Sequence, residues 1–268
     1  MPELPEVETI RKGLEPCIIG GRIQKILFGD PKILQVSSKS LRQKIQGQTV
    51  RRLDRRGKFL IIELDTNYLI FHFGMTGQLT FRDPSRTDEK FERHSVTGLQ
   101  RAVQHAPDRH THLQIHFSRG GAMLFRDVRK FGKVFLLEKK ETVRSAFFGK
   151  LGLEPFTEQY NLDAFLQKFK NRKLRLKSLL LDQRFVAGVG NIYADESLFE
   201  SAIHPSRATQ SLRRVEKIRL FYSIPLVLQR GIHYGGTSFR DYVNSQGERG
   251  SQQERLLVYG RQGKGCYR

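Results

Sequence analysis

The first ten residues, MPELPEVETI, place a proline at position 2 and glutamates at positions 3 and 6. If Met1 is removed, Pro2 carries a free secondary amine, and an α-amino group with a pKa of about 8 is available as a nucleophile near neutrality. Attack of this amine on the aldehydic carbon of a sugar gives a cationic iminium, which promotes elimination of the phosphates attached to that sugar. Glu3 is placed to carry protons during these steps.

The same ten residues also suit the start of a helix. Proline is tolerated in a first turn, and Glu3 and Glu6 would complement the helix dipole there. Retention of Met1 would convert the Pro2 nitrogen into an amide and abolish the nucleophile. The residues alone therefore leave both interpretations open.

A basic cluster surrounds Lys58, with arginines at positions 51, 52, 55 and 56. Such charges repel one another unless they are solvated or face phosphates. The whole chain carries 47 Lys and Arg against 27 Asp and Glu, which gives a formal net charge of +20. This balance indicates a polyanionic partner such as nucleic acid, although a solvated basic turn explains Lys58 equally well.

The elements that must position these residues fall into two parts. Residues 4–15 have apolar side chains three or four positions apart, which predicts one amphipathic helix. From about residue 20 to residue 138, short apolar runs separated by turn signals predict an all-β sandwich or barrel. Helices are predicted over residues 161–183, 185–202 and 207–232. Residues 82–110 are polar and without period, which predicts a long exposed loop.

Composition excludes several classes of protein. The apolar runs are far shorter than the about 20 residues that span a bilayer, and the acidic start does not have the pattern of a secretory signal. Cys17 and Cys266 are the only cysteines, which is typical of a reduced, cytosolic chain. We therefore expect a cytoplasmic monomer that does not associate with membranes.

Five segments, in this order along the chain, closely resemble the formamidopyrimidine-DNA glycosylase family, bacterial base-excision enzymes for oxidised purines. They are MPELPEVET, RRGKFLI, FHFGMTGQL, RDVRKFGKV and LLLDQRFVAGVGNIYADESLF. The resemblance implies an α+β multidomain fold: an N-terminal helix plus β-sandwich, a C-terminal helical domain with a helix-two-turn-helix, and a truncated zinc-finger segment. The expected parts are a catalytic domain over 1–138, a hinge over 139–160, a DNA-binding domain over 161–234, and a base-pocket loop with the incomplete finger over 235–268.

By this resemblance the activity is that of a bifunctional DNA glycosylase and AP lyase of base excision repair. It would remove 8-oxoguanine and formamidopyrimidines through a Schiff base on the N-terminal proline, followed by β,δ-elimination. The partner expected is double-stranded DNA that contains oxidised bases or abasic sites. The catalytic residues implied are Pro2, Glu3, Lys58 and Glu6. Among them Glu3 handles protons, Glu6 positions groups, and Lys58 lies on a hairpin tip at the active site and contacts phosphate.

Four residues are expected to contact DNA: His72, Arg129, Asn191 and Lys177. His72 would contact a backbone phosphate by resemblance, although a packed strand histidine fits the residue as well. Asn191 follows two glycines, and we expect it to cap the next helix while its amide contacts a phosphate at the helix N-terminus. Lys177 belongs to a basic run between residues 168 and 184, predicted to be helical, and this run favours phosphate contact over a plain packing unit.

Met75, Arg129 and Phe131 match the family's probe set. An enzyme that acts on a base must take it out of the stack, and a thioether, a guanidinium and an aromatic ring are suitable groups to fill the hole. Taken singly, the methionine and the phenylalanine would also fit a core. The segment GGTSFRDYVN at 235–244 matches the family's loop over the flipped purine. Its candidate base-pocket residues are Thr237, Ser238 and Tyr242.

The tail departs from the family pattern. The segment resembling LLVYGRQGKGC opens a four-cysteine zinc finger in the family, whereas here Cys266 is a lone remnant ligand. Tetrahedral zinc needs four Cys or His ligands, so we expect that this site cannot form from the chain as given and that the chemistry needs no cofactor. Gln252 also stands where the family commonly has phenylalanine. A truncated or frame-shifted sequence and an enzyme that manages without the finger are the two explanations.

Three alternatives stay open at this point. An endonuclease VIII-like enzyme would prefer oxidised pyrimidines, although the LPEVET opening and the RKFG motif favour the purine branch. A catalytically impaired protein that binds damaged DNA is favoured by the missing finger. A basic RNA-binding protein would leave the specific N-terminus unexplained.

Overall fold

The structure is a computed structural model that describes residues 1–83 and 107–268 of the chain. Most of the loop expected over 82–110 lies outside the described residues. The first helix, α1 (Leu4–Ile18), is followed by β1 (Ile23–Phe28), a 3-10 turn (Pro31–Ile33) and α2 (Ser38–Ile45). The remaining strands are β2 (Arg52–Arg56), β3 (Phe59–Glu63), β4 (Asn67–His72), β5 (Gly77–Arg82), β6 (Thr111–Phe117), β7 (Ala122–Asp127) and β8 (Lys133–Glu138).

The strands form two four-stranded antiparallel sheets, in the orders β1-β6-β7-β5 and β2-β3-β4-β8. A core of Ile, Leu, Val and Phe side chains from both sheets and from α1 fills the N-terminal part. In the β2–β3 hairpin Arg56 pairs with Phe59, so Gly57 and Lys58 form its two-residue turn. Gly57 has a φ of 56°, a conformation that glycine adopts without steric cost.

The C-terminal part is helical. It contains α3 (Glu141–Phe148), α4 (Leu162–Gln167), α5 (Leu176–Leu181), α6 (Asn191–Glu200) and α7 (Arg214–His233), with 3-10 turns at Thr209–Ser211 and Gln252–Arg255. The α+β fold predicted from the sequence is confirmed. No helix among the described residues is long and apolar enough to cross a membrane.

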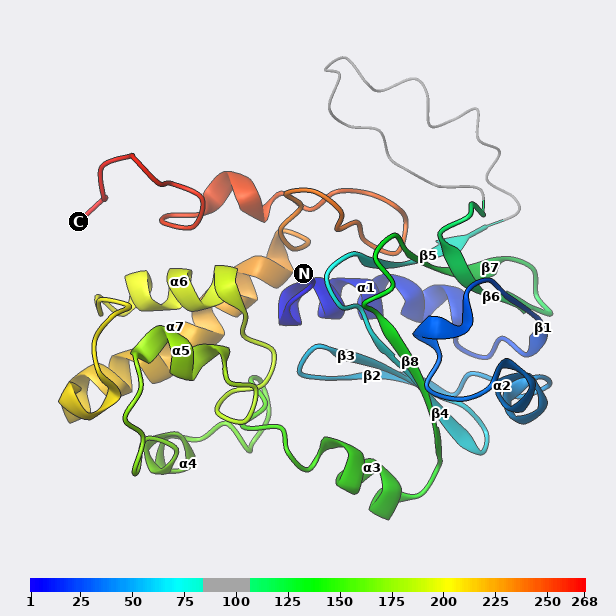
Figure 1. Ribbon diagram of the computed structural model, residues 1–268, viewed down its shortest axis with the longest axis horizontal. Helices are drawn as coiled ribbons and strands as arrows, with labels where there is room; N and C mark the ends of the chain where they lie inside the picture. Colours follow the sequence, from blue (N-terminus) through cyan, green and yellow to red (C-terminus); the bar gives the residue numbers. More distant parts are fainter. Residues whose placement is uncertain (84–106) are drawn as a thin grey trace.

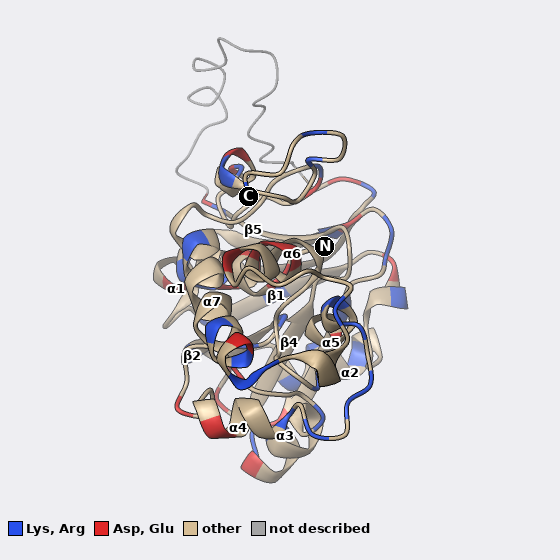
Figure 2. Ribbon diagram, turned by 90° about the vertical axis from the view of Figure 1, so that its left-hand side faces the viewer, with Lys and Arg blue, Asp and Glu red and all other residues tan. Residues whose placement is uncertain are grey.

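Two predicted helical segments and the predicted hinge differ from the structure. The basic residues 168–175 lie in a connection between α4 and α5 instead of in one helix over 161–183, and Asn171 within it has a φ of 60°. Repulsion among the closely spaced cations of this connection opposes a regular helix. Its Lys and Arg residues are visible in Figure 2. Likewise α6 begins only at Asn191, after the glycines at 188 and 190, and α3 lies inside the segment expected to be a plain hinge.

Helix α1 joins the two parts (Figure 1). Its Val7, Ile10 and Leu14 belong to the core of the sheets, whereas Leu4 belongs to the core of the helical part. The Leu4 amide also donates to the Gly188 carbonyl oxygen at 3.0 Å. The N-terminal residues that could do chemistry therefore lie at the junction of two cores.

Candidate active site

Glu3 is the N-cap residue of α1 and is almost fully buried, with an exposed fraction of 3%. Its carboxylate accepts hydrogen bonds from the Gly190 amide at 2.5 Å and from the Ile192 amide at 3.0 Å. A Cβ on Gly190 would lie 2.4 Å from the Glu3 Cδ atom, so only glycine allows this approach. Burial raises the pKa of Glu3 to about 7; the charge of Lys58 lowers that pKa and the charge of Glu6 adds to the rise. Glu3 is thus poised to gain or lose a proton near neutral pH.

Glu6, one helical turn further along α1, is buried below Glu3. Its Oε2 atom accepts from the Glu3 amide at 2.8 Å, and its Oε1 atom accepts from the Tyr193 hydroxyl at 2.7 Å and the Thr237 amide at 2.8 Å. Burial raises the pKa of Glu6, and the hydrogen bonds from Tyr193, Thr237 and Glu3 oppose that rise. The carboxylate links α1 to α6 and to the segment after α7.

Lys58 lies on the hairpin turn that the sequence predicted, but its side chain is buried. Burial lowers the pKa of Lys58, and the charges of Glu3 and Glu6 oppose that shift. The three side chains form one charge cluster contributed by α1 and the β2–β3 turn. The lysine therefore faces the two carboxylates.

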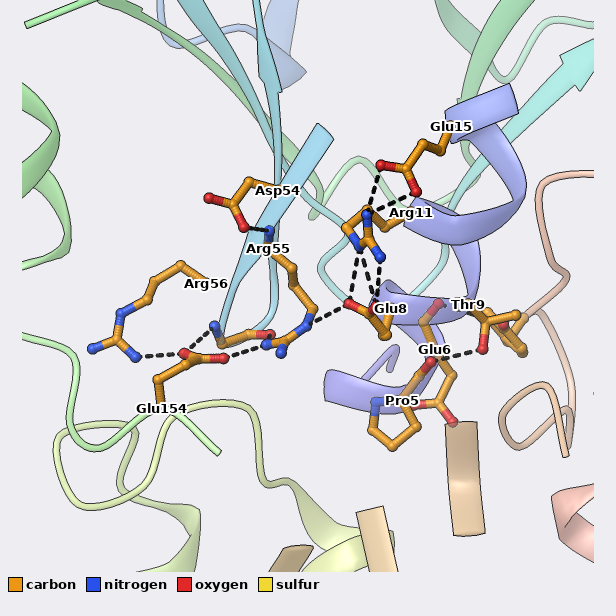
Figure 3. Close-up of polar contacts among 12 residues, drawn as sticks. Pro5, Glu6, Glu8, Thr9, Arg11, Glu15, Asp54, Arg55, Arg56 and Glu154 are labelled. Carbon is orange, nitrogen blue, oxygen red and sulfur yellow. Dashed lines mark hydrogen bonds and ion pairs between the residues drawn. The ribbon is translucent and has the colours of Figure 1, made fainter. Parts of the chain in front are cut away.

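The arginines around Lys58 all pair with carboxylates, but they differ in exposure. Arg51 and Arg52 stay more than half exposed, as the solvated interpretation expects, whereas Arg55 and Arg56 are largely buried. Arg51 pairs with Asp65 at 2.6 Å, and Arg52 pairs with Asp54 at 3.1 Å. Arg55 contacts Glu8 at 3.1 Å, and both Arg55 and Arg56 contact Glu154 (Figure 3). For Arg55 and Arg56 the mutual repulsion that the sequence indicates is relieved inside the protein, by the buried acids Glu8 and Glu154 that are distant in sequence.

His72, at the end of β4, is largely buried, and burial together with the charge of Lys58 lowers its pKa. The Gly74 amide donates to its Nδ1 atom at 3.3 Å, and its ring centroid lies 4.8 Å from that of Phe59. These contacts belong to a packed strand histidine. Phosphate contact by His72 stays a prediction.

Met75, Arg129 and Phe131 lie together at the surface. The Arg129 Nη1 atom is 3.6 Å from the Met75 sulfur, and the Arg129 Cζ atom is 4.6 Å from the centroid of the Phe131 ring. Met75 is 45% exposed and Phe131 is 50% exposed, so neither is a core residue. The structure brings the three chemical types of the predicted probe into one exposed group.

Asp127 was not singled out from the sequence, yet it shapes the loop that carries Arg129 and Phe131. Its buried carboxylate accepts from the Thr76 hydroxyl at 2.5 Å, the Arg129 amide at 3.2 Å and the Gly132 amide at 2.6 Å. Its position within RDVRKFGKV was the available signal. An aspartate just before a turn commonly accepts from nearby backbone amides.

The loop after α7 closes over Glu6. Thr237, Ser238 and Tyr242 are all buried. The Ser238 hydroxyl donates to the Tyr242 carbonyl oxygen at 2.9 Å, and the Tyr242 hydroxyl donates to the Gly235 carbonyl oxygen at 3.0 Å. These bonds give the loop a fixed shape through its own side chains.

A cavity of about 440 Å³ opens between this loop and the N-terminal part. It is lined by Met1, Pro2, Met75, Thr76, Gly77, Arg129, Ile192, Thr237, Phe239, Arg240, Asp241, Tyr242, Tyr259 and Gly260. The N-terminus, two probe residues and two of the three base-pocket candidates therefore share one cavity. Ser238 is not among the lining residues, and its hydroxyl contacts the loop backbone at Tyr242.

Asn191 and Lys177 are not among the residues that line this cavity. Gly190, and not Asn191, is the N-cap residue of α6, and Asn191 is the exposed first residue of the helix. The expected cap is wrong because the Glu3 carboxylate already accepts from the amides at this helix N-terminus. Lys177 donates to the Asp195 carboxylate at 2.8 Å. Contact of either residue with phosphate stays a prediction.

The tail is held against α6 by Glu196, a second residue that sequence reasoning missed. Its buried carboxylate accepts from the Leu257, Val258 and Tyr259 amides, each at 2.9 Å. Cys266 is exposed, and within the described residues no group of three or more His, Cys, Asp and Glu could hold a metal ion. The residues present do not fit the zinc site that the resemblance implies.

Two family models match the chain. Residues 1–134 match the formamidopyrimidine-DNA glycosylase N-terminal domain, and residues 151–243 match the formamidopyrimidine-DNA glycosylase H2TH domain. The formamidopyrimidine-DNA glycosylase of Heliobacterium modesticaldum is 40% identical over 271 residues, covering 100% of this chain and 92% of the relative. That of Enterococcus faecalis is 38% identical, covering 100% of this chain and 89% of the relative.

Solved structures agree with these relatives. Lactococcus lactis Fpg in complex with DNA that contains an abasic site is 34% identical, with a TM-score of 0.85 over 99% of this chain and 91% of that chain. The same Fpg with DNA that contains N7-benzyl-Fapy-dG also has a TM-score of 0.85 and 34% identity, over 100% of this chain and 91% of that chain. The resemblance drawn from the five motifs is confirmed, and the chain belongs to the formamidopyrimidine-DNA glycosylase family.

Proposed function

We propose that this chain removes oxidised purines, such as 8-oxoguanine and formamidopyrimidines, from double-stranded DNA and then cleaves the strand at the abasic site. The observation that carries this proposal is the placement of Pro2 on the wall of the 440 Å³ cavity, next in sequence to a glutamate whose pKa is about 7. A nucleophile beside a group that exchanges protons near neutrality is the arrangement that this chemistry needs. The cytoplasm, where the bacterial chromosome lies, is the expected location.

The first step forms a bond between the Pro2 nitrogen and the sugar C1′ atom. The N-glycosidic bond breaks, and the base leaves with its electron pair and takes up a proton. The Pro2 nitrogen then loses its proton, the C1′–O4′ bond breaks, O4′ takes up a proton, and a cationic iminium forms between the nitrogen and C1′. Loss of a proton from C2′ expels the 3′ phosphate, and a second elimination expels the 5′ phosphate. Water then releases Pro2 from the remaining sugar fragment. The steps use an amine and proton transfers, and none of them requires a metal.

Each residue has a proposed role in this sequence. Glu3 carries the protons of ring opening and elimination, and Lys58 balances the negative charge of Glu3 and Glu6. Thr237 and Tyr242 line the base pocket, while Ser238 holds the pocket loop. Met75, Arg129 and Phe131 fill the stack after the base has left it. The segment 139–160 is the proposed boundary between the catalytic part and the DNA-binding part, to which Asn191 and Lys177 belong.

Borohydride trapping tests the nucleophile. Reduction of the iminium during reaction with a duplex containing 8-oxoguanine opposite cytosine should link the chain covalently to DNA. A variant with an uncleaved residue before Met1 has an amide at Pro2 and should form no adduct, and Pro2→Gly should reduce the adduct strongly. Pro5→Gly, which alters the same helix turn without touching the N-terminal amine, is the matched control and should still be trapped.

Two results would overturn the proposal. A mature wild-type chain, shown by mass measurement to begin at Pro2, that binds the duplex tightly without any adduct would be a binding protein. An adduct that forms on duplexes with oxidised pyrimidines and not on those with 8-oxoguanine would assign the chain to the endonuclease VIII type of specificity. The same assay run with and without a zinc chelator tests whether activity depends on zinc.

A further inference from the structure

The buried Glu6 carboxylate is surrounded by donors from three parts of the chain. The Glu3 amide comes from α1 itself, the Tyr193 hydroxyl from α6, and the Thr237 amide from the loop after α7. Burial of a carboxylate is costly unless hydrogen bonds replace its hydration. Because all three groups donate hydrogen bonds, they favour the ionised form of the Glu6 carboxylate.

Tyr193 is the only side chain among these three donors, and it is fully buried. Its hydroxyl lies 2.7 Å from the Glu6 Oε1 atom and 3.3 Å from the Thr237 Oγ1 atom. A Cβ added at Gly231 of α7 would lie 2.5 Å from the tyrosine ring, so α7 packs directly against the ring. Tyr193 does not line the cavity, and therefore it acts through other residues.

We propose that Tyr193 is a positioning residue whose hydroxyl holds the Glu6 carboxylate, and with it the base-pocket loop, in place beneath Glu3. This inference rests on the proposed function, in which Glu3 moves protons and Thr237 lines the pocket. The Tyr193 hydroxyl contacts both the Glu6 carboxylate and Thr237. This one group therefore fixes the position of the pocket loop relative to Glu6 and the adjoining Glu3.

The arrangement has an electrostatic consequence. The groups that face the Glu3 and Glu6 carboxylates are Lys58 from the β2–β3 turn, Tyr193 from α6, and Thr237 and Tyr242 from the loop after α7. The Tyr193 hydrogen bond lowers the pKa of Glu6, and the charge of Glu6 raises the pKa of Glu3. Loss of the hydroxyl raises the pKa of Glu6, which weakens the negative charge beside Glu3. The pKa of Glu3 should therefore fall.

The test is the pH dependence of single-turnover cleavage of a duplex with 8-oxoguanine opposite cytosine, between pH 5 and pH 9. In the pH–rate profile, the limb that Glu3 gives near pH 7 should move to lower pH in Tyr193→Phe, because the lost hydrogen bond raises the pKa of Glu6 and weakens its charge beside Glu3. The matched control is Tyr160→Phe, since Tyr160 is a partly buried tyrosine of the helical part whose hydroxyl also donates a hydrogen bond, to the Phe221 carbonyl oxygen at 2.9 Å. The control should keep the wild-type limb.

Glu6→Gln provides a second variant that does not depend on the folding of Tyr193→Phe. It removes the charge that the tyrosine is proposed to hold, so it should move the Glu3 limb in the same direction. In a Glu6→Gln background, Tyr193→Phe should cause no further movement. Full additivity of the two shifts would show that the hydroxyl acts by another route and would overturn the proposal.

The failures of the two proposals are distinguishable. A wild-type chain that gives no borohydride adduct refutes the proposed function. A trapped and active wild type whose limb stays unchanged in a folded Tyr193→Phe variant refutes the positioning role alone. Circular dichroism on every variant shows whether it is folded, so that an unchanged limb is interpreted only for a folded protein.

Discussion

Glu154 ties the hairpin that carries Lys58 to the segment between α3 and α4. Its carboxylate contacts the Arg55 and Arg56 guanidinium groups and accepts from the Gly57 amide at 2.8 Å (Figure 3). The side chains of Glu154, Arg55 and Arg56 are 5%, 8% and 18% exposed. Glu154→Gln keeps the size of the side chain and removes the charge, so it tests the ion pairs with little change in packing.

The expected cost follows from what each partner retains. Removing one member of a buried ion pair typically costs about 3–5 kcal/mol. Arg55 keeps Glu8 at 3.1 Å, and Arg56 keeps the Gly152 carbonyl oxygen at 2.6 Å, which places the change near the lower end, about 3 kcal/mol. At 2–4 °C per kcal/mol for chains near this size, the melting temperature should fall by about 6–12 °C.

The same change should also lower activity. Gly57 packs against the loop that precedes α6, since a Cβ on it would lie 3.1 Å from the Ala187 Cβ atom. A looser turn moves Lys58 away from Glu3, and misplacement by about 1 Å can cost about 100-fold in rate. Thermal unfolding followed by circular dichroism and single-turnover cleavage of the lesion duplex measure the two effects.

The matched control is Glu138→Gln. Glu138 pairs with Lys140 at 2.7 Å, but the two side chains are 54% and 67% exposed. Exposed pairs of this kind contribute little to stability, so neither the melting temperature nor the cleavage rate should change measurably. Equal melting temperatures for Glu154→Gln and Glu138→Gln would refute the reasoning, and a fall in melting temperature with full activity would refute the link to Lys58.

Three further predictions concern the site. The pKa of Glu3 is raised from 4.5 to about 7, so the stability that its protonated form contributes is complete below pH 4.5 and is lost as the pH rises through 7. Glu3→Gln should therefore show a flatter stability between pH 5 and pH 8 in urea titrations, the wild type losing about 3 kcal/mol over that range. Phe131→Ala should leave the melting temperature unchanged, because the ring is 50% exposed, and should weaken binding to an abasic-site duplex by about 1–3 kcal/mol in fluorescence anisotropy. Glu196→Gln should free the tail that its carboxylate holds through three amides, and limited trypsin digestion with mass spectrometry should then show faster cleavage after Arg255 and Arg261.

The β-strand part of the fold was accessible from the sequence because its signals are local. Alternating apolar runs bounded by glycine and aspartate gave the sheets, and the apolar spacing in residues 4–15 gave α1. The connection between α4 and α5 was harder, since its basic residues are predicted as part of one helix over 161–183, whereas Asn171 takes a φ of 60°. Tertiary contacts, such as that of the Thr209 hydroxyl with the Arg172 carbonyl oxygen at 2.6 Å, decide the backbone there.

The candidate site, too, was predictable from the sequence only in part. Residue types and motif matches indicated Pro2, Glu3 and the exposed probe group. They did not indicate that the arginines beside Lys58 are paired, because Glu8 and Glu154 are distant from them in sequence. Charge counted along the chain cannot distinguish a cation that faces phosphate from one that faces a buried carboxylate.

The N-terminus of α6 illustrates what this distinction means for function. Two glycines before a helix indicated a phosphate site, yet the anion that accepts from this helix N-terminus is the Glu3 carboxylate, at 2.5 Å from the Gly190 nitrogen. The helix dipole and the two amides thus act on the carboxylate that we propose carries protons, and they limit the rise in its pKa that burial causes. Because Leu4 packs in the helical core and Val7 in the core of the sheets, any shift between the two parts of the chain would move Glu3 relative to these amides. The protonation of Glu3 is therefore coupled to how closely the two parts are packed together.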